Sequence, residues 1–155
     1  MILSDETLRT RYPLIVDPFC LRSVHVGTGM SYGLSCAGYD VRVREGCLLA
    51  PQGFRLLSTR ERFEMPDDVV GMVCDKSTLA RQGLTVQNTI IEPGWCGYLT
   101  LEITNHSWWF RRIVAGQPIA QILFFRTDYP VCRPYAGKYQ DQPPEPVSAK
   151  REGQQ

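Results

Sequence analysis

The stretch GYLTLEITN, residues 97–105, alternates apolar and polar side chains along most of its length. Successive side chains of an extended strand point to opposite faces, so this pattern predicts a β-strand. Leu99, Leu101 and Ile103 would then share the core side of the strand. Glu102 lies on the other face and is expected to point away from the core.

Short β-rich runs fill the chain from Val41 onward, and turn residues such as Gly and Pro separate them. These runs are VRVREGCLLA (41–50), GFRLLS (53–58), VVGMVC (69–74), LTVQNTII (84–91), RRIVAG (111–116) and PIAQILFF (118–125). The nearly continuous apolar run at 119–125 is expected to be a strand that is buried on both faces. Short strands with regular turn signals predict a sandwich or a barrel in a single, mainly β domain.

Two short helices are expected beside the strands. Ser4 is followed by two acidic residues, which is typical of a helix N-terminus and predicts a helix over residues 5–11. A second helix is predicted within residues 75–83, where Gly83 suits a helix end because it tolerates a left-handed backbone.

The start of the second helix has the features of an anion site. Ser77 or Thr78 is its expected cap, and Ser77 shares a helix face with Arg81. Backbone N–H groups without intrahelical partners, together with Lys76 and Arg81, favour a phosphate group at this point. An ordinary cap beside a surface charge is the alternative.

Composition narrows the classes of function. The 155 residues are 43% hydrophobic and 21% charged, as in an ordinary globular domain. The formal charge of +1 is too small for a general nucleic-acid binder, although a few local positive groups suffice for a small anion. The six cysteines are scattered singly without a C-x-x-C pair, which excludes zinc fingers and redox dithiols. The N-terminus lacks a signal-like or membrane-spanning apolar run, so a cytoplasmic protein without membrane contacts is expected.

The composition changes after Pro134. We divide the chain into a β domain over 1–134 and a C-terminal tail over 135–155 whose end is expected to be disordered. The tail is rich in Lys, Tyr and Gln, and we expect it to be mobile when the protein is empty. It could fold over a bound nucleotide; simple fraying is the alternative.

Four stretches together resemble the dCTP deaminases, a branch of the dUTPase superfamily. They occur in the order found in that family, and their combined spacing is more specific than any one of them. The stretches are SYGLSCAGYDVR (31–42), KSTLARQG (76–83), IEPGWCG (91–97) with TLE (100–102), and GKYQDQ (137–142).

The resemblance implies a dUTPase-like fold of the β-clip type, a distorted β-barrel or jelly-roll. It also implies a homotrimer with active sites at subunit boundaries, a tail that closes over the nucleotide, and Mg²⁺ carried by the triphosphate. Glu102 occupies the place of an acid that the deaminases have and that plain dUTPases lack. The resemblance therefore implies deamination of dCTP to dUTP and ammonia.

This chemistry requires a group that takes a proton from water, so that the oxygen attacks C4 of cytosine, and later passes protons on to the departing ammonia. Zinc deaminases use H-x-E and P-C-x-x-C motifs for this purpose. His25 precedes Val26-Gly27 and His106 precedes Ser107-Trp108, so neither motif is present. Protein groups alone are therefore expected to activate the water, without zinc.

The resemblance assigns the catalytic roles to three residues. Glu102 is the general base and proton shuttle, Ser77 holds the geometry around the water, and Arg81 orients the carboxylate. Without the resemblance, Glu102 would be interpreted as a solvated carboxylate. The substrate-binding set comprises Lys76, Ser77, Thr78, Leu79, Ala80, Arg81, Glu92, Thr100, Leu101, Glu102, Tyr135, Lys138 and Gln142.

Several substrate contacts have specific expected partners. Lys76 and the amides of Ser77 and Thr78 would bind phosphates, Glu92 would bind the 3′-hydroxyl of deoxyribose, and Thr100 would lie against the base. The side chains of the tail would close over the triphosphate.

Two other functions remain open. A bifunctional enzyme would also cleave dUTP to dUMP with an acid at Glu92, and a non-catalytic protein would only sense nucleotides. The aromatic sequence Trp108-Trp109-Phe110 is expected to be core or trimer contact rather than a platform for bases.

Overall fold

The computed structural model describes residues 1–11 and 15–151, so the expected disorder at 152–155 falls outside the described part. The elements in chain order are α1 (Asp5–Arg11), β1 (Val16–Asp17), β2 (Ser23–Val24), β3 (Ser31–Ser35), β4 (Gly38–Arg42), β5 (Cys47–Leu49), β6 (Phe54–Glu64), β7 (Val69–Asp75), α2 (Ser77–Ala80), β8 (Leu84–Val86), β9 (Ile90–Ile91), β10 (Cys96–Asn105), β11 (Arg111–Ile113) and β12 (Pro118–Arg126). The predicted mainly β architecture with two short helices is confirmed.

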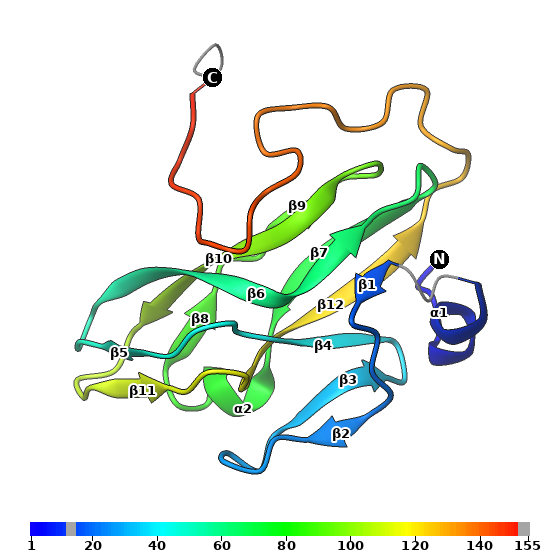
Figure 1. Ribbon diagram of the computed structural model, residues 1–155. Helices are drawn as coiled ribbons and strands as arrows, with labels where there is room; N and C mark the ends of the chain where they lie inside the picture. The colour runs from blue at the N-terminus through cyan, green and yellow to red at the C-terminus, as the bar shows by residue number, and fades with distance from the viewer. Residues whose placement is uncertain (12–14, 152–155) are drawn as a thin grey trace.

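The strands form a six-stranded sheet, a four-stranded sheet and a separate two-stranded ribbon (Figure 1). The larger sheet has the order β2-β3-β4-β12-β7-β9, and the smaller one has the order β1-β6-β10-β8. All of their paired strands run antiparallel, and β5 pairs with β11 separately. Side chains from both sheets, including Tyr39, Phe63 and Phe124, are fully buried and form one core.

Strand β10 has the predicted faces. Leu99, Leu101 and Ile103 are buried, whereas the Glu102 side chain points outward and is only partly covered. Strand β12 differs from its prediction of burial on both faces: its burial alternates, with Ile122 buried and Leu123 partly exposed. The apolar run is therefore a central strand with one side in the core and the other only partly covered.

The helices match their predicted positions but not the predicted cap. The N-cap of α2 is Lys76, whose side chain makes no capping hydrogen bond, so Ser77 and Thr78 begin the helix instead of capping it. Gly83 has a φ of +79°, as expected for a left-handed residue after the helix. The sequence-based strand assignment missed β1 to β3. Two of them, β1 and β2, have only two residues, which is too short for a visible alternation, and β1 pairs with the distant strand β6.

A bulge interrupts the pairing of β6 with β10. Tyr98 pairs with Arg62 and Thr100 pairs with Ser58, so three residues of β6 face the single residue Leu99. The Thr59 hydroxyl fills the gap: it accepts a hydrogen bond from the Leu99 N–H at 2.9 Å and donates one to the Glu61 carbonyl at 2.7 Å. Because the bulge adds two residues, the alternation of faces is the same on both sides of it.

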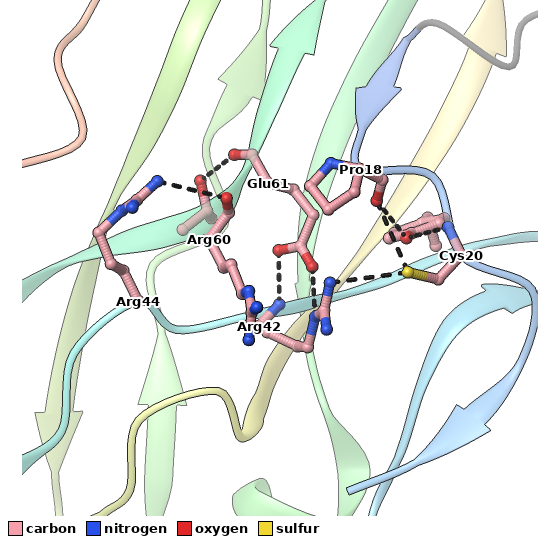
Figure 2. A network of polar contacts seen from close by, with 8 residues as sticks. Pro18, Cys20, Arg42, Arg44, Arg60 and Glu61 are labelled. Carbon is pink, nitrogen blue, oxygen red and sulfur yellow. Dashed lines mark hydrogen bonds and ion pairs between the residues drawn. The ribbon is translucent and has the colours of Figure 1, made fainter.

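A buried ion pair joins the two large sheets at this bulge (Figure 2). Glu61 accepts from the Arg42 backbone N–H at 2.8 Å and from Arg42 Nε at 2.6 Å. The two side chains are 0% and 8% exposed, respectively. Arg42 also lies 4.4 Å from the centre of the Tyr32 ring and donates to the Cys20 sulfur at 3.7 Å. The Glu61 carboxylate thus satisfies a backbone donor and a guanidinium that water does not reach.

We predict that Glu61→Gln lowers the free energy of unfolding by about 3 kcal/mol or more, because it leaves the Arg42 charge buried without a counter-charge. Urea denaturation measures this loss. The matched control is Glu64→Gln, which removes a surface ion pair between Glu64 and Arg62. The Glu64 side chain is 65% exposed. This control should change the free energy of unfolding by less than about 1 kcal/mol. Equal effects of the two substitutions would contradict the role of the buried pair.

Candidate functional site

A cavity of about 470 Å³ lies against the face of β10 that points away from the core. Its volume falls within the usual range for small-molecule sites. Strand β10 contributes Thr100 and Glu102 of this face to the lining, together with Leu99 of the core face. The other lining residues are Phe54 and Leu56 of β6, residues 89–92, Trp95, and five C-terminal residues: Tyr135, Tyr139, Gln142, Val147 and Ala149.

Glu102 is the ionisable group with an altered environment in this cavity. It pairs across the strands with Leu56, an apolar neighbour on the same face. Its Oε2 atom is buried and has no hydrogen-bond partner among the described residues. Burial raises the pKa of the Glu102 carboxyl, because the charged form loses water, and a hydrogen bond from the residue's own backbone offsets this only in part. Such a carboxylate is suited to accept a proton from a ligand or from a water molecule.

Thr100 lies two residues before Glu102 on the same strand face and is also buried. Its hydroxyl accepts a hydrogen bond from the backbone N–H of Val147 at 3.0 Å. A C-terminal residue therefore contacts the strand directly at the cavity.

The C-terminal segment packs on the turn between β9 and β10 (Figure 1). Trp95 Nε1 donates to the Tyr139 carbonyl at 2.6 Å, and the Gln140 side chain bonds the backbone of Gly94 and Cys96 at 2.9 and 3.0 Å. Gly97 allows a close approach: with a φ of +135°, a Cβ there would lie 2.5 Å from the Gln142 nitrogen. The glycine of the W-x-G turn thus makes room for the tail.

Five of the sequence-predicted binding residues meet in this cavity: Glu92, Thr100, Glu102, Tyr135 and Gln142. Two others lie outside its lining. Leu101 points into the core and is fully buried. The Lys138 ammonium lies 5.5 Å from the centre of the Tyr139 ring.

The predicted residues of α2 also lie outside the cavity lining. Helix α2 is at the opposite end of the molecule from β9 and the C-terminal segment (Figure 1). Ser77 and Arg81 are exposed, and Lys76 Nζ pairs with Asp40 Oδ2 at 2.7 Å. Thr78 and Ala80 are exposed as well, whereas Leu79 is buried. One chain therefore does not bring Ser77 and Arg81 together with Glu102.

Within residues 1–11 and 15–151, no group of three or more His, Cys, Asp or Glu side chains could hold a metal ion. The described helices include none that is long and apolar enough to cross a membrane.

Comparison with known proteins identifies the family. The sequence model described as dCTP deaminase-like matches residues 35–127. A dCTP deaminase of Campylobacter fetus is 36% identical to this chain, over 83% of this chain and 86% of the relative. The chain belongs to the dCTP deaminase-like family. A dCTP deaminase of Roseiflexus castenholzii is also 36% identical over the same shares, and one of Acidobacterium capsulatum is 34% identical over 91% of this chain and 94% of the relative.

Solved structures confirm the predicted dUTPase-like fold. The native EIAV dUTPase has a TM-score of 0.54 and 24% identity, covering 65% of this chain and 84% of that chain. A dUTPase of Staphylococcus bacteriophage 80alpha has a TM-score of 0.57 and 20% identity, covering 77% and 91%. The dCTP deaminase-like chain therefore has the β-clip fold that was expected from its four motifs.

The motifs did not reveal the apolar walls of the cavity. Phe54 and Leu56 come from a run that was correctly predicted as a strand, but its register beside Glu102 depends on tertiary pairing. Val147 follows a proline-rich stretch that has no strand or helix pattern.

Trp108, Trp109 and Phe110 are 79%, 73% and 63% exposed. The interpretation of these aromatics as core is therefore wrong for the single chain, and trimer contact stays a prediction.

We predict that Glu102→Gln stabilises the fold at pH 7 by an amount on the order of 1 kcal/mol, because a neutral amide is less costly to bury than a carboxylate. The raised pKa means that the folded protein binds the proton more tightly than the unfolded chain. The wild type therefore loses stability as pH rises from the unfolded value of about 4.3 through the folded value.

Thermal unfolding from pH 3 to pH 8 measures this difference. Below about pH 4 both states of the wild type carry a protonated Glu102, so the gap between the two proteins should close. The exposed Glu45→Gln is the matched control and should show no such pH-dependent gap. A constant gap at all pH values would contradict the assignment to Glu102.

Proposed function

We propose that this protein deaminates dCTP to dUTP and ammonia, with Glu102 as the general base. The observation that supports this most strongly is the Glu102 carboxylate, which faces a cavity of nucleotide-compatible size with one oxygen buried and unpartnered. Membership of the dCTP deaminase-like family agrees with that chemistry.

In the proposed reaction, Glu102 accepts a proton from water while the water oxygen forms a bond to C4 of cytosine. Glu102 delivers this proton to N3 of the ring. It then takes the proton of the new C4 hydroxyl and passes it to the exocyclic nitrogen. The C4–N bond breaks, ammonia leaves, C4 keeps the oxygen as a carbonyl and N3 keeps its proton. An apolar wall beside Glu102 favours this cycle. The protonated form of Glu102 is neutral, so an apolar environment adds little free-energy cost when the carboxylate takes up the proton.

The nucleotide would bring Mg²⁺ on its triphosphate. We assign this ion to the substrate and not to a resident metal site. Thr100 and Gln142 are polar groups of the cavity lining, and Glu92, which also lines it, is suited to the sugar 3′-hydroxyl.

We further propose a homotrimer in which a second subunit supplies Ser77 and Arg81 to the cavity. Ser77 begins α2 and Arg81 directly follows it; both side chains are exposed, and α2 lies at the end of the molecule away from β9 and the C-terminal segment. A closed rotationally symmetric ring can bring α2 of one subunit to β10 of the next. An arginine arriving there would also supply a donor for the unpartnered Glu102 oxygen.

A bifunctional enzyme that converts dCTP to dUMP is a second candidate. It is favoured by one observation: Glu92 and Glu102 line the same cavity, so two carboxylates are available near one ligand. A protein that only senses nucleotides has less support, because binding alone does not require an unpartnered buried carboxylate.

We predict that the wild type releases ammonia from dCTP and that Glu102→Gln reduces kcat at least about 100-fold while retaining dCTP binding, because an amide cannot accept the proton. Ammonia, dUTP, dUMP and pyrophosphate should be followed together. Accumulating dUTP identifies the deaminase, and dUMP identifies the bifunctional enzyme. The surface variant Glu45→Gln is the activity control. Substantial turnover by Glu102→Gln would overturn the mechanism.

We predict that mixed trimers of Arg81→Ala and Glu102→Gln recover activity although each variant alone is inactive. If each site takes Glu102 from one subunit and Arg81 from another, random mixing at equal amounts gives about one quarter of sites with both groups intact. The two variants should be unfolded together, refolded and assayed. Sedimentation must show a trimer of about 53 kDa, three times the 17.6 kDa chain. No recovery in such trimers would exclude the shared site.

A further inference from the structure

The C-terminal segment 143–150 forms one wall of the cavity. Val147 and Ala149 line it together with Thr100 and Glu102. The segment is held on both sides of Val147. On one side, Tyr98 N–H donates to the Gln142 carbonyl at 3.1 Å, and on the other, Lys150 N–H donates to the Tyr139 hydroxyl at 2.9 Å.

The contact between Val147 and Thr100 joins this segment to the catalytic strand. The Val147 backbone N–H donates to Thr100 Oγ1 at 3.0 Å, and Thr100 is buried. A threonine hydroxyl has one proton to donate and two lone pairs. Because one lone pair is occupied by Val147, the hydroxyl proton points away from that amide. No acceptor for this proton is found among the described residues.

We propose that the Val147 amide is a positioning group that orients the Thr100 hydroxyl as a hydrogen-bond donor toward an acceptor atom of the bound pyrimidine nucleoside. This inference rests on the proposed function and adds a residue to its site. The side chain of Val147 contributes apolar wall, whereas its backbone N–H sets the direction of the Thr100 proton. The C-terminal segment thus takes part in recognition of the nucleoside, separately from any contact with phosphates.

The test compares Val147→Pro with Val147→Ala. Proline lacks the backbone N–H and keeps an apolar side chain, whereas alanine keeps the N–H and loses part of the side chain. For Val147→Pro we expect KM for dCTP to rise about 3- to 10-fold with kcat nearly unchanged, as for loss of one neutral hydrogen bond made equally before and during reaction. Val147→Ala removes part of the apolar wall but keeps the N–H, so its KM measures the side-chain contribution alone, and the KM of Val147→Pro should exceed it about 3- to 10-fold.

A double-mutant cycle with Thr100→Val separates positioning from a general effect on the segment. If Val147 acts through the hydroxyl, Val147→Pro should raise KM in the wild type and have no further effect in the Thr100→Val background. Thr100→Ser retains the hydroxyl and should restore the sensitivity to Val147→Pro. Equilibrium binding of dCTP in the non-turnover Glu102→Gln background should give the same pattern in Kd.

The outcomes distinguish this inference from the proposed function. If the wild type deaminates dCTP but Val147→Pro and Val147→Ala behave alike, the positioning role is wrong and the deaminase stands. A full effect of Val147→Pro in the Thr100→Val background would also overturn it. If the wild type releases no ammonia from dCTP, the proposed function itself fails. Thermal unfolding checks that Val147→Pro leaves the fold intact, as expected for a position outside both sheets.

Discussion

The buried contact between Glu61 and Arg42 is the constraint on which the arrangement of the two sheets depends. Arg42 ends β4 in the larger sheet and Glu61 lies at the bulge of β6 in the smaller one. At such a junction backbone groups lose their ladder partners, and a buried N–H without an acceptor is costly. One carboxylate satisfies both the Arg42 N–H and its guanidinium, so the chain can pass from one sheet to the other without an unpaired charge in the core.

The same bulge controls the position of the candidate site. Thr100 resumes regular pairing with Ser58 immediately after the bulge, and Glu102 follows opposite Leu56. Both residues follow the bulge and are two positions apart on β10, so their polar side chains share the side away from the core. The strand that builds the core with Leu101 and Ile103 therefore also presents the candidate base, and the rigidity of a central strand limits the movement of that base.

The carboxylate in the candidate site and the carboxylate in the core differ in how completely they are hydrogen-bonded. Glu61 is fully buried but has donors on both oxygens, whereas Glu102 is less buried and has one oxygen without a partner. A structural carboxylate gains from complete pairing. A carboxylate that must take and return a proton is better left under-paired until the ligand, water or a neighbouring subunit arrives. The C-terminal segment forms one wall of this cavity. It agrees with the interpretation that groups from outside β10 complete the site around Glu102.

Local patterns were sufficient to predict the mainly β class, the faces of β10 and the left-handed Gly83, because each depends on local periodicity or backbone freedom. The four motifs of the sequence also indicated the family and the set of candidate residues. The folded chain was needed to show that Phe54 and Leu56 lie beside Glu102, that Val147 contacts Thr100, and that β12 has one side only partly covered. These facts depend on strand register and on contacts between distant segments, which local patterns do not encode. The separation of α2 from the cavity could not be predicted from local patterns either, because it follows from the path of the whole chain.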